Sequence, residues 1–175
     1  MNTKAIVRQI IHQYNLPLAG RHGIFHWARV LENGLRLAEM TGANAQVVTL
    51  FALFHDSRRL NEKRDDGHGL RGGEFARTLR TRIFSLSEQE FELFFRACHL
   101  HTDGHTEGDI TLQACWDADR LDLGRVGIMP KPELLCTDAA RDLIGWANQR
   151  AVAGHQSEIV RRAWGIGEGA LKGKN

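Results

Sequence analysis

Residues 47–56 read VVTLFALFHD, a nearly unbroken apolar run that ends in His55 and Asp56. A segment this apolar, without a polar face, predicts a helix buried on all sides. An ionisable pair at the end of such a helix is costly to bury unless something compensates its charge. Imidazole beside carboxylate is a combination that divalent transition metals bind. We therefore expect further ligands for this pair elsewhere in the chain.

Apolar residues in the rest of the chain recur mostly at helical spacing, and only three prolines occur. We therefore predict an all-α fold. Besides the helix that carries His55, helices are predicted over about residues 3–14, 24–40, 70–82, 87–101, 110–123 and 137–152. Helix starts are predicted at Asn44, at a capping box of Ser87 and Glu90, and at Thr137. The segments 57–69 and 102–109 are polar and contain glycine, which predicts loops. We expect one domain over residues 1–165 and a flexible tail over residues 166–175.

The composition narrows the classes of partner. A formal net charge of +2 does not favour nucleic acid as a partner. Nine histidines favour metal or phosphate chemistry, and three cysteines without a CxxC pair argue against a disulfide framework. No stretch approaches the roughly 20 apolar residues of a membrane span, and the first residues lack the apolar run of a signal peptide. We expect a cytoplasmic protein without a membrane partner, and the sequence does not predict its oligomeric state.

Helical phase distinguishes inward-facing polar residues from solvated ones. Asp119 falls near the centre of the apolar stripe of its helix, whereas Asp117 falls on the opposite face and Asp122 at the margin. His101 lies on the edge of the preceding helix's stripe, while His99 points toward solvent. Asp119 and His101 are therefore the better candidates for inward ligands.

Four groups from separate segments then stand out as candidate ligands of one metal ion: His26, His55, Asp56 and Asp119. This mixture of nitrogen and oxygen donors suits Mn, Fe, Co, Ni or Zn, with Mg as a further possibility. His68 and His101 are candidates for a second ion, with Asp56 as the bridge. Taken singly, a buried histidine is more often satisfied by a backbone carbonyl.

The order His26, then His55-Asp56, then Asp119 resembles the HD superfamily of metal-dependent phosphohydrolases, which is named for that doublet. The resemblance covers about residues 20–140 and rests on HGIFHWARV, ALFHDSRR and WDADRLDLGRVG around these residues. It implies a compact HD-domain helical bundle with a central metal site, in which the four residues are the ligands. HGLRGGEFA around His68 and ACHLHTDG around His101 resemble the additional histidines of two-metal members. The loop between Asp56 and His68 is short, so one ion and two ions both stay open.

The resemblance implies hydrolysis of a phosphomonoester or phosphodiester, such as a nucleotide or another small phosphorylated metabolite. We expect His68, His101 and Arg58 to act in catalysis. Arginines can bind phosphate oxygens through two parallel hydrogen bonds. The residues expected to bind the substrate are His22, Arg58, Arg59 and Arg71.

Two other functions compete with hydrolysis. Some two-metal members of the superfamily carry iron and oxidise their substrates, so a di-iron oxygenase is one alternative. A non-catalytic sensor module that keeps the ligands for stability is the other. The chain contains no GxSxG elbow and no P-loop that would indicate another catalytic apparatus.

Overall fold

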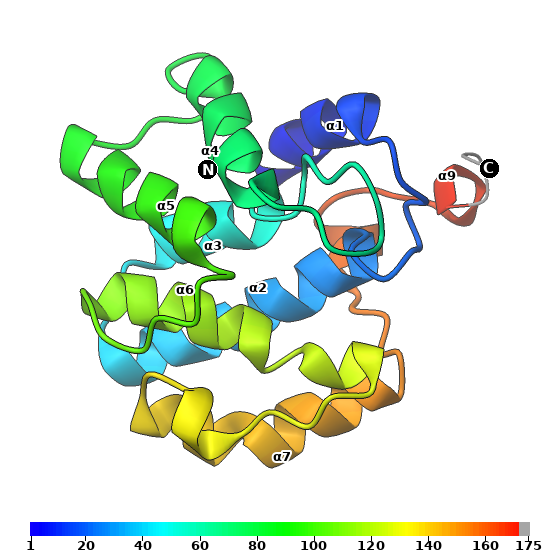
Figure 1. The fold of residues 1–175 in the computed structure, drawn as a ribbon. Helices are drawn as coiled ribbons and strands as arrows, with labels where there is room; N and C mark the ends of the chain where they lie inside the picture. Colours follow the sequence, from blue (N-terminus) through cyan, green and yellow to red (C-terminus); the bar gives the residue numbers. More distant parts are fainter. Residues whose placement is uncertain (172–175) are drawn as a thin grey trace.

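The computed structural model describes residues 1–171 and confirms the all-α prediction, since this part of the chain forms helices and no strand. Figure 1 shows the helices gathered into one compact bundle. Their bounds are α1 (Thr3–Gln13), α2 (Ile24–Thr41), α3 (Ala45–Phe54), α4 (His68–Leu79), α5 (Glu88–Leu100), α6 (Ile110–Arg120), η1 (Leu123–Val126), η2 (Pro132–Leu134), α7 (Asp138–Val152), α8 (Ile159–Arg162) and α9 (Glu168–Leu171).

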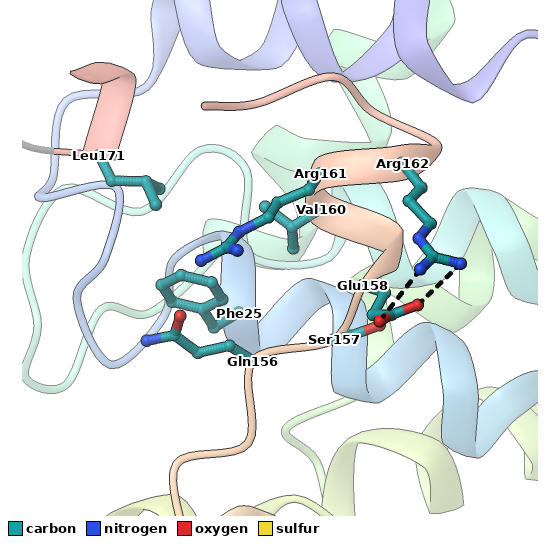
Figure 2. Close-up of a pocket in the computed structure, with 8 residues that line it drawn as sticks. All are labelled: Phe25, Gln156, Ser157, Glu158, Val160, Arg161, Arg162 and Leu171. Carbon is teal, nitrogen blue, oxygen red and sulfur yellow. Dashed lines mark hydrogen bonds and ion pairs between the residues drawn. The ribbon is translucent and has the colours of Figure 1, made fainter. Parts of the chain in front are cut away.

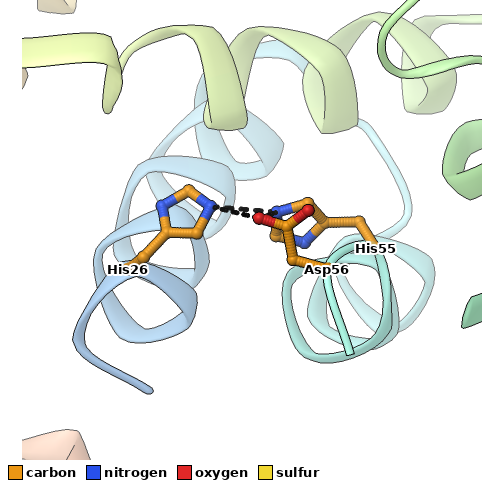
Figure 3. Close-up of side chains that lie close together, drawn as sticks. All are labelled: His26, His55 and Asp56. Atoms are coloured by element: carbon orange, nitrogen blue, oxygen red, sulfur yellow. Dashed lines mark hydrogen bonds and ion pairs between the residues drawn. The ribbon is translucent and has the colours of Figure 1, made fainter. Parts of the chain in front are cut away.

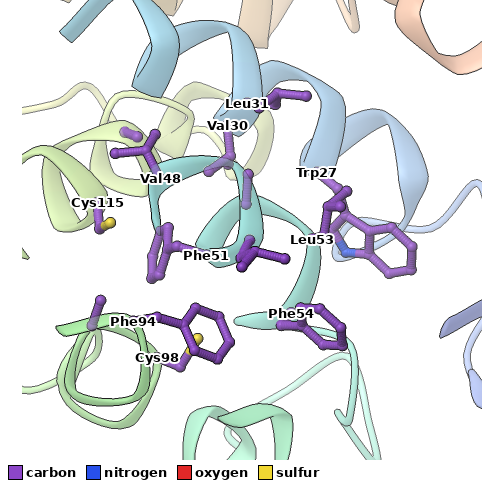
Figure 4. Close-up of a cluster of buried hydrophobic side chains, with 14 of the residues drawn as sticks. Trp27, Val30, Leu31, Val48, Phe51, Leu53, Phe54, Phe94, Cys98 and Cys115 are labelled. Atoms are coloured by element: carbon purple, nitrogen blue, oxygen red, sulfur yellow. The ribbon is translucent and has the colours of Figure 1, made fainter. Parts of the chain in front are cut away.

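Helix α3 lies at the centre of the bundle, as its composition predicts. It contacts α1, α2, α4, α5 and α6, and every residue from Val47 to Phe54 is buried. Figure 4 shows Phe51 and Phe54 of this helix among side chains of the neighbouring helices, including Trp27 and Phe94. Because α3 ends inside the bundle, His55 and Asp56 lie in the protein interior.

Polar caps begin the helices where the sequence predicts them. The side chain of Asn44 accepts hydrogen bonds from the backbone N–H groups at the start of α3. Ser87 and Glu90 form a capping box at the start of α5, and the Thr137 hydroxyl caps α7. Helix α4 differs from the prediction because it begins at His68, which places that residue on a helix instead of in the loop.

Glycines allow α4 to approach the backbone of its neighbours closely. A Cβ atom at Gly69 would lie 2.0 Å from the carbonyl oxygen of Cys98 in α5. A Cβ atom at Gly72 would lie 2.2 Å from the carbonyl oxygen of Phe54 in α3. This close packing brings the first turn of α4, and with it His68, to the end of α3.

Replacing Gly69 by alanine is expected to destabilise the fold, by about 3 kcal/mol or more, because the added methyl group overlaps a backbone carbonyl. Gly145 of α7 is a matched helical control, since a Cβ atom there has no neighbour within 4 Å. Gly145→Ala should stabilise the protein by up to about 1 kcal/mol. Urea unfolding followed by circular dichroism measures both, and equal effects of the two changes would contradict this account of α4.

The segment predicted as a flexible tail from residue 166 begins with residues that pack against the core. Ile166 is buried, and Leu171 of the short helix α9 packs against the core. Residues 172–175 of the predicted tail lie outside the described residues. Within residues 1–171, no helix has both the length and the apolar character needed to cross a membrane.

Candidate metal centre

Four side chains from three helical segments converge where α3 ends. His26 comes from α2, His55 and Asp56 follow α3, and Asp119 comes from α6. His26 Nε2 lies 3.0 Å from His55 Nε2, 3.4 Å from Asp56 Oδ2 and 3.4 Å from Asp119 Oδ1. His55 Nε2 lies 3.6 Å from the same Asp56 oxygen and 3.8 Å from the same Asp119 oxygen. Figure 3 shows the His26 ring facing His55 and Asp56.

The hydrogen bonds of the two imidazoles determine which nitrogen faces the centre as a free ligand. His55 Nδ1 donates to the carbonyl oxygen of Phe51 at 3.1 Å, and His26 Nδ1 donates to Asp122 Oδ2 at 2.7 Å. Because a carbonyl and a carboxylate only accept, both Nδ1 atoms carry hydrogen. In the neutral rings the two Nε2 lone pairs therefore face each other across 3.0 Å. Such an arrangement needs a proton or a metal cation between them.

Asp119 supplies independent support for a cation. Its Oδ1 atom is buried and accepts no hydrogen bond from the described residues. A buried carboxylate oxygen without a donor is costly. Donor atoms bound tetrahedrally at about 2.0–2.2 Å lie about 3.4 Å apart, close to the separations of the atoms around His26. The donor set and its spacing therefore fit a divalent transition metal.

A second group of ligands lies on the other side of Asp56. Asp56 Oδ1 is 3.1 Å from His68 Nε2 and 4.0 Å from His101 Nε2, and these two nitrogens are 3.0 Å apart. Both rings again donate from Nδ1, to the carbonyl oxygens of Asp65 and Cys98. The structure thus brings all six predicted ligands together, with one oxygen of Asp56 facing each group. Buried His and Asp side chains of both groups can hold a metal ion.

Burial and neighbouring charges shift the pKa values of His26 and His55 in opposite directions. Burial lowers the pKa of His55 to about 3 despite the carboxylates of Asp56 and Asp119. Burial and Arg125 also lower the pKa of His26, but the hydrogen bonds to Asp122 and Asp56 outweigh them and raise it above its ordinary value. His55 is therefore neutral at physiological pH, and of the two rings His26 is the one that more readily holds a proton.

Metal binding is expected to release the proton held by His26, because a ligating nitrogen must be deprotonated. Affinity for the first ion should therefore rise by about tenfold per pH unit until the pH exceeds the raised pKa of His26. Calorimetric titration with Mn²⁺ in buffers of different ionisation enthalpy measures the number of protons released on binding. Affinity that does not change between pH 5.5 and 7 would contradict the assignment of the proton to His26.

Two residues that the sequence did not assign to the site orient His26. Asp122 accepts from His26 Nδ1, and Arg29 donates to both oxygens of Asp122 at 2.7 and 3.1 Å. Replacing a carboxylate that orients a ligating histidine typically lowers metal affinity by about 10–100-fold. Helical phase placed Asp122 at the stripe margin. The structure ends α6 at Arg120, so Asp122 lies in the following turn and reaches His26.

The arginines predicted to bind phosphate lie in different places. Arg58 donates to the backbone and side chain of Gln13 and lies over the ring of Phe75, away from the ligands. Arg71 donates to Asp65 Oδ1 and to nearby loop carbonyls. Of the three, only Arg59 contacts the centre, where its NH1 group lies 3.3 Å from Asp56 Oδ1. Arg58 and Arg71 therefore hold the loop between α3 and α4 in place.

His22 forms a half-buried pair with a residue of that loop. His22 Nδ1 lies 2.5 Å from Glu62 Oε2, and its backbone carbonyl accepts hydrogen bonds from Tyr14 and Trp27. Its ring centre is 6.4 Å from that of His26. Burial lowers the pKa of His22, although Asp56 and Glu62 oppose the shift. His22 is thus fixed beside the candidate centre without being one of its ligands.

Two cavities differ in their relation to the centre. A polar cavity of 340 Å³ reaches the second ligand group and is lined by Arg59, Arg64, Asp65, Asp66, His68, Thr102 and Asp103. A cavity of 440 Å³ lies between Phe25 of α2 and the C-terminal segment, where Figure 2 shows Glu158 paired with Arg162. None of the six candidate ligands lines the second cavity. The first is therefore the better route to the centre.

Comparisons with protein-family models, with curated proteins and with solved structures give no match for this chain. Conclusions about function therefore depend on the residues of the site and on the motif resemblance.

Proposed function

We propose that the protein is a metal-dependent phosphohydrolase of the HD type that cleaves a phosphomonoester or phosphodiester of a small metabolite. The observation that supports it best is the bridging position of Asp56, whose two oxygens face two separate groups of imidazole nitrogens. Sites that activate water for attack on phosphate commonly hold two metal ions about 3.5–4 Å apart. Histidine and aspartate together favour Mn, Fe, Co, Ni or Zn.

A bound divalent ion would polarise a phosphoryl oxygen and lower the pKa of a coordinated water. The chain's own residues provide the ligands and their orientation. Asp119 and His26 present their free donor atoms to the first position. Asp122 and the Phe51 carbonyl fix the tautomers of His26 and His55, so that neither ring has to reorient during the reaction.

The charge of the centre supports an anionic substrate. Three carboxylates at the centre are each paired with a guanidinium group. The pairs are Asp56 with Arg59, Asp119 with Arg125, and Asp122 with Arg29. Their formal charges cancel before any ion binds. One divalent cation would then make the centre positive by two charges, which attracts a phosphate dianion.

His22 is the proposed donor of a proton to the leaving oxygen. Glu62 accepts from Nδ1, so the proton available for transfer is the one on Nε2 of the imidazolium form. Because burial lowers the pKa of His22, this form is populated at acidic pH. A histidine held by a carboxylate in this way is a common general acid. His22 also lies near enough to Asp56 and Arg125 to be affected by their charges.

An assay of the purified protein with Mn²⁺, Co²⁺, Ni²⁺ or Mg²⁺ tests the proposal. Substrates would be p-nitrophenyl phosphate, bis(p-nitrophenyl) phosphate and a set of nucleotides. We expect phosphate or p-nitrophenol release that disappears with a chelator and returns with added metal. Absence of turnover with every metal, from protein shown to hold metal, would overturn the proposal.

A further inference from the structure

Arg59 is a buried guanidinium whose hydrogen bonds join the candidate centre to the loop between α3 and α4. It is 8% exposed. Its NH1 group lies 3.3 Å from Asp56 Oδ1 and 3.2 Å from His68 Nε2. Its other nitrogens donate to the carbonyl oxygens of Asn61 at 3.3 Å and Lys63 at 2.5 Å. All three nitrogens are therefore engaged.

The two atoms next to NH1 are ligand atoms of the second group. His68 Nδ1 donates to the Asp65 carbonyl, so His68 Nε2 presents a lone pair to the Arg59 N–H group. Asp56 Oδ1 likewise accepts from NH1. A metal ion bound to His68 Nε2 would need the one lone pair of that nitrogen, which faces the Arg59 N–H group. It would also place a second positive charge beside the guanidinium.

We propose that Arg59 is a resident cation at the second metal position, and that a second ion binds there only by displacing it. The inference rests on the proposed function in taking the centre as a metal site. The first position is surrounded by four donor atoms: His26 Nε2, His55 Nε2, Asp56 Oδ2 and Asp119 Oδ1. The hydrogen bonds of Arg59 go to other atoms. The first ion therefore binds with Arg59 in place, and the second binds more weakly.

Displacement of Arg59 would also change the loop. The Asn61 and Lys63 carbonyls lose their donor when the guanidinium leaves, and Arg59 itself lines the polar cavity beside His68. Binding of the second ion should consequently make residues 60–64 less ordered, and an ordered loop should weaken binding of the second ion. The number of bound ions thus determines the shape of the polar cavity by which a substrate would reach the centre.

Equilibrium dialysis against Co²⁺, with elemental analysis, tests the proposal on the full chain. Arg59→Met removes the charge and keeps the apolar stem. We expect it to raise affinity for the second ion by at least about tenfold, because no cation has to leave. Affinity for the first ion should change by less than about threefold. Arg58→Met is the matched control, since Arg58 contacts Gln13 and Phe75 instead of the centre, and it should alter neither affinity.

A second measurement needs no change at Arg59. Hydrogen exchange of residues 60–64 in the unaltered chain should accelerate with the second equivalent of Co²⁺ and not with the first. In His68→Gln, which lacks a ligand of the second position, this acceleration should disappear. Unchanged or weaker binding of the second ion by Arg59→Met, or exchange that is insensitive to the second ion, would overturn the role of Arg59. Failure to bind any ion would instead overturn the metal centre and the proposed function with it.

Discussion

Asp56→Asn is expected to reduce metal-dependent phosphate release by on the order of 1000-fold or more, equivalent to about 4 kcal/mol of transition-state stabilisation. Asp56 offers one oxygen to His26 and His55 and the other to His68. An amide keeps the shape of the side chain but loses its charge and one acceptor atom. Neither position would then have its shared ligand. Steady-state kinetics and metal content of the same preparation measure the loss.

Asp117→Asn is the control for this change. Helical phase predicted Asp117 on the face opposite the apolar stripe, but the structure buries it beneath the start of α7. Its carboxylate accepts from the backbone N–H groups of Cys136 and Thr137 and from the Thr137 hydroxyl. Its replacement should lower the free energy of unfolding by about 1–3 kcal/mol and leave metal content unchanged. Full metal content and full activity in Asp56→Asn would contradict its assignment as the bridging ligand.

His22→Gln is expected to lower kcat by about 10²–10⁴-fold for an ester with a poor leaving group, because protonation of the leaving oxygen is lost. The loss should be much smaller for p-nitrophenyl phosphate, whose leaving group needs little protonation. Metal content should stay the same, since His22 is held by Glu62 and is not one of the candidate ligands. Comparing an alkyl phosphate with p-nitrophenyl phosphate measures the difference.

The exposed residue His99 provides the matched histidine control, and His99→Gln should leave both rates unchanged. Glu62→Gln should reproduce part of the His22 effect, because the amide no longer stabilises the imidazolium. An equal loss on both substrates in His22→Gln, or a loss of metal, would show that His22 acts on the centre and not on the leaving group.

Local sequence signals predicted most of the fold because each acts over a few residues. Asn44, Ser87 with Glu90, and Thr137 each begin a helix where predicted. The apolar run of α3 indicated a helix buried on every side. The start of α4 was placed too late because the glycines at its beginning are typical of loops. Here they are needed for close approach to α3 and α5.

Helical phase also predicted the inward position of Asp119 and His101, but it could not predict contacts between distant segments. The hydrogen bond from His26 to Asp122 spans 96 residues, and that from His22 to Glu62 spans 40. Phosphate binding by Arg58, Arg59 and Arg71 was predicted from their position just after the His55-Asp56 doublet. In the structure, Arg58 instead contacts Gln13 and Phe75, and Arg71 contacts the loop residue Asp65. Arg59 is buried beside His68. We propose that ion binding by His68 and His101 depends on that contact.

Metal content per chain, by elemental analysis of protein purified without chelator, tests the central claim most directly. Four histidines with their Nδ1 atoms engaged and their Nε2 atoms turned toward Asp56 predict at least one transition-metal ion per chain. The ion should be lost in Asp56→Asn and kept in Asp117→Asn. A folded protein that contains no metal, and takes up none from Mn²⁺, Co²⁺ or Zn²⁺, would contradict the account.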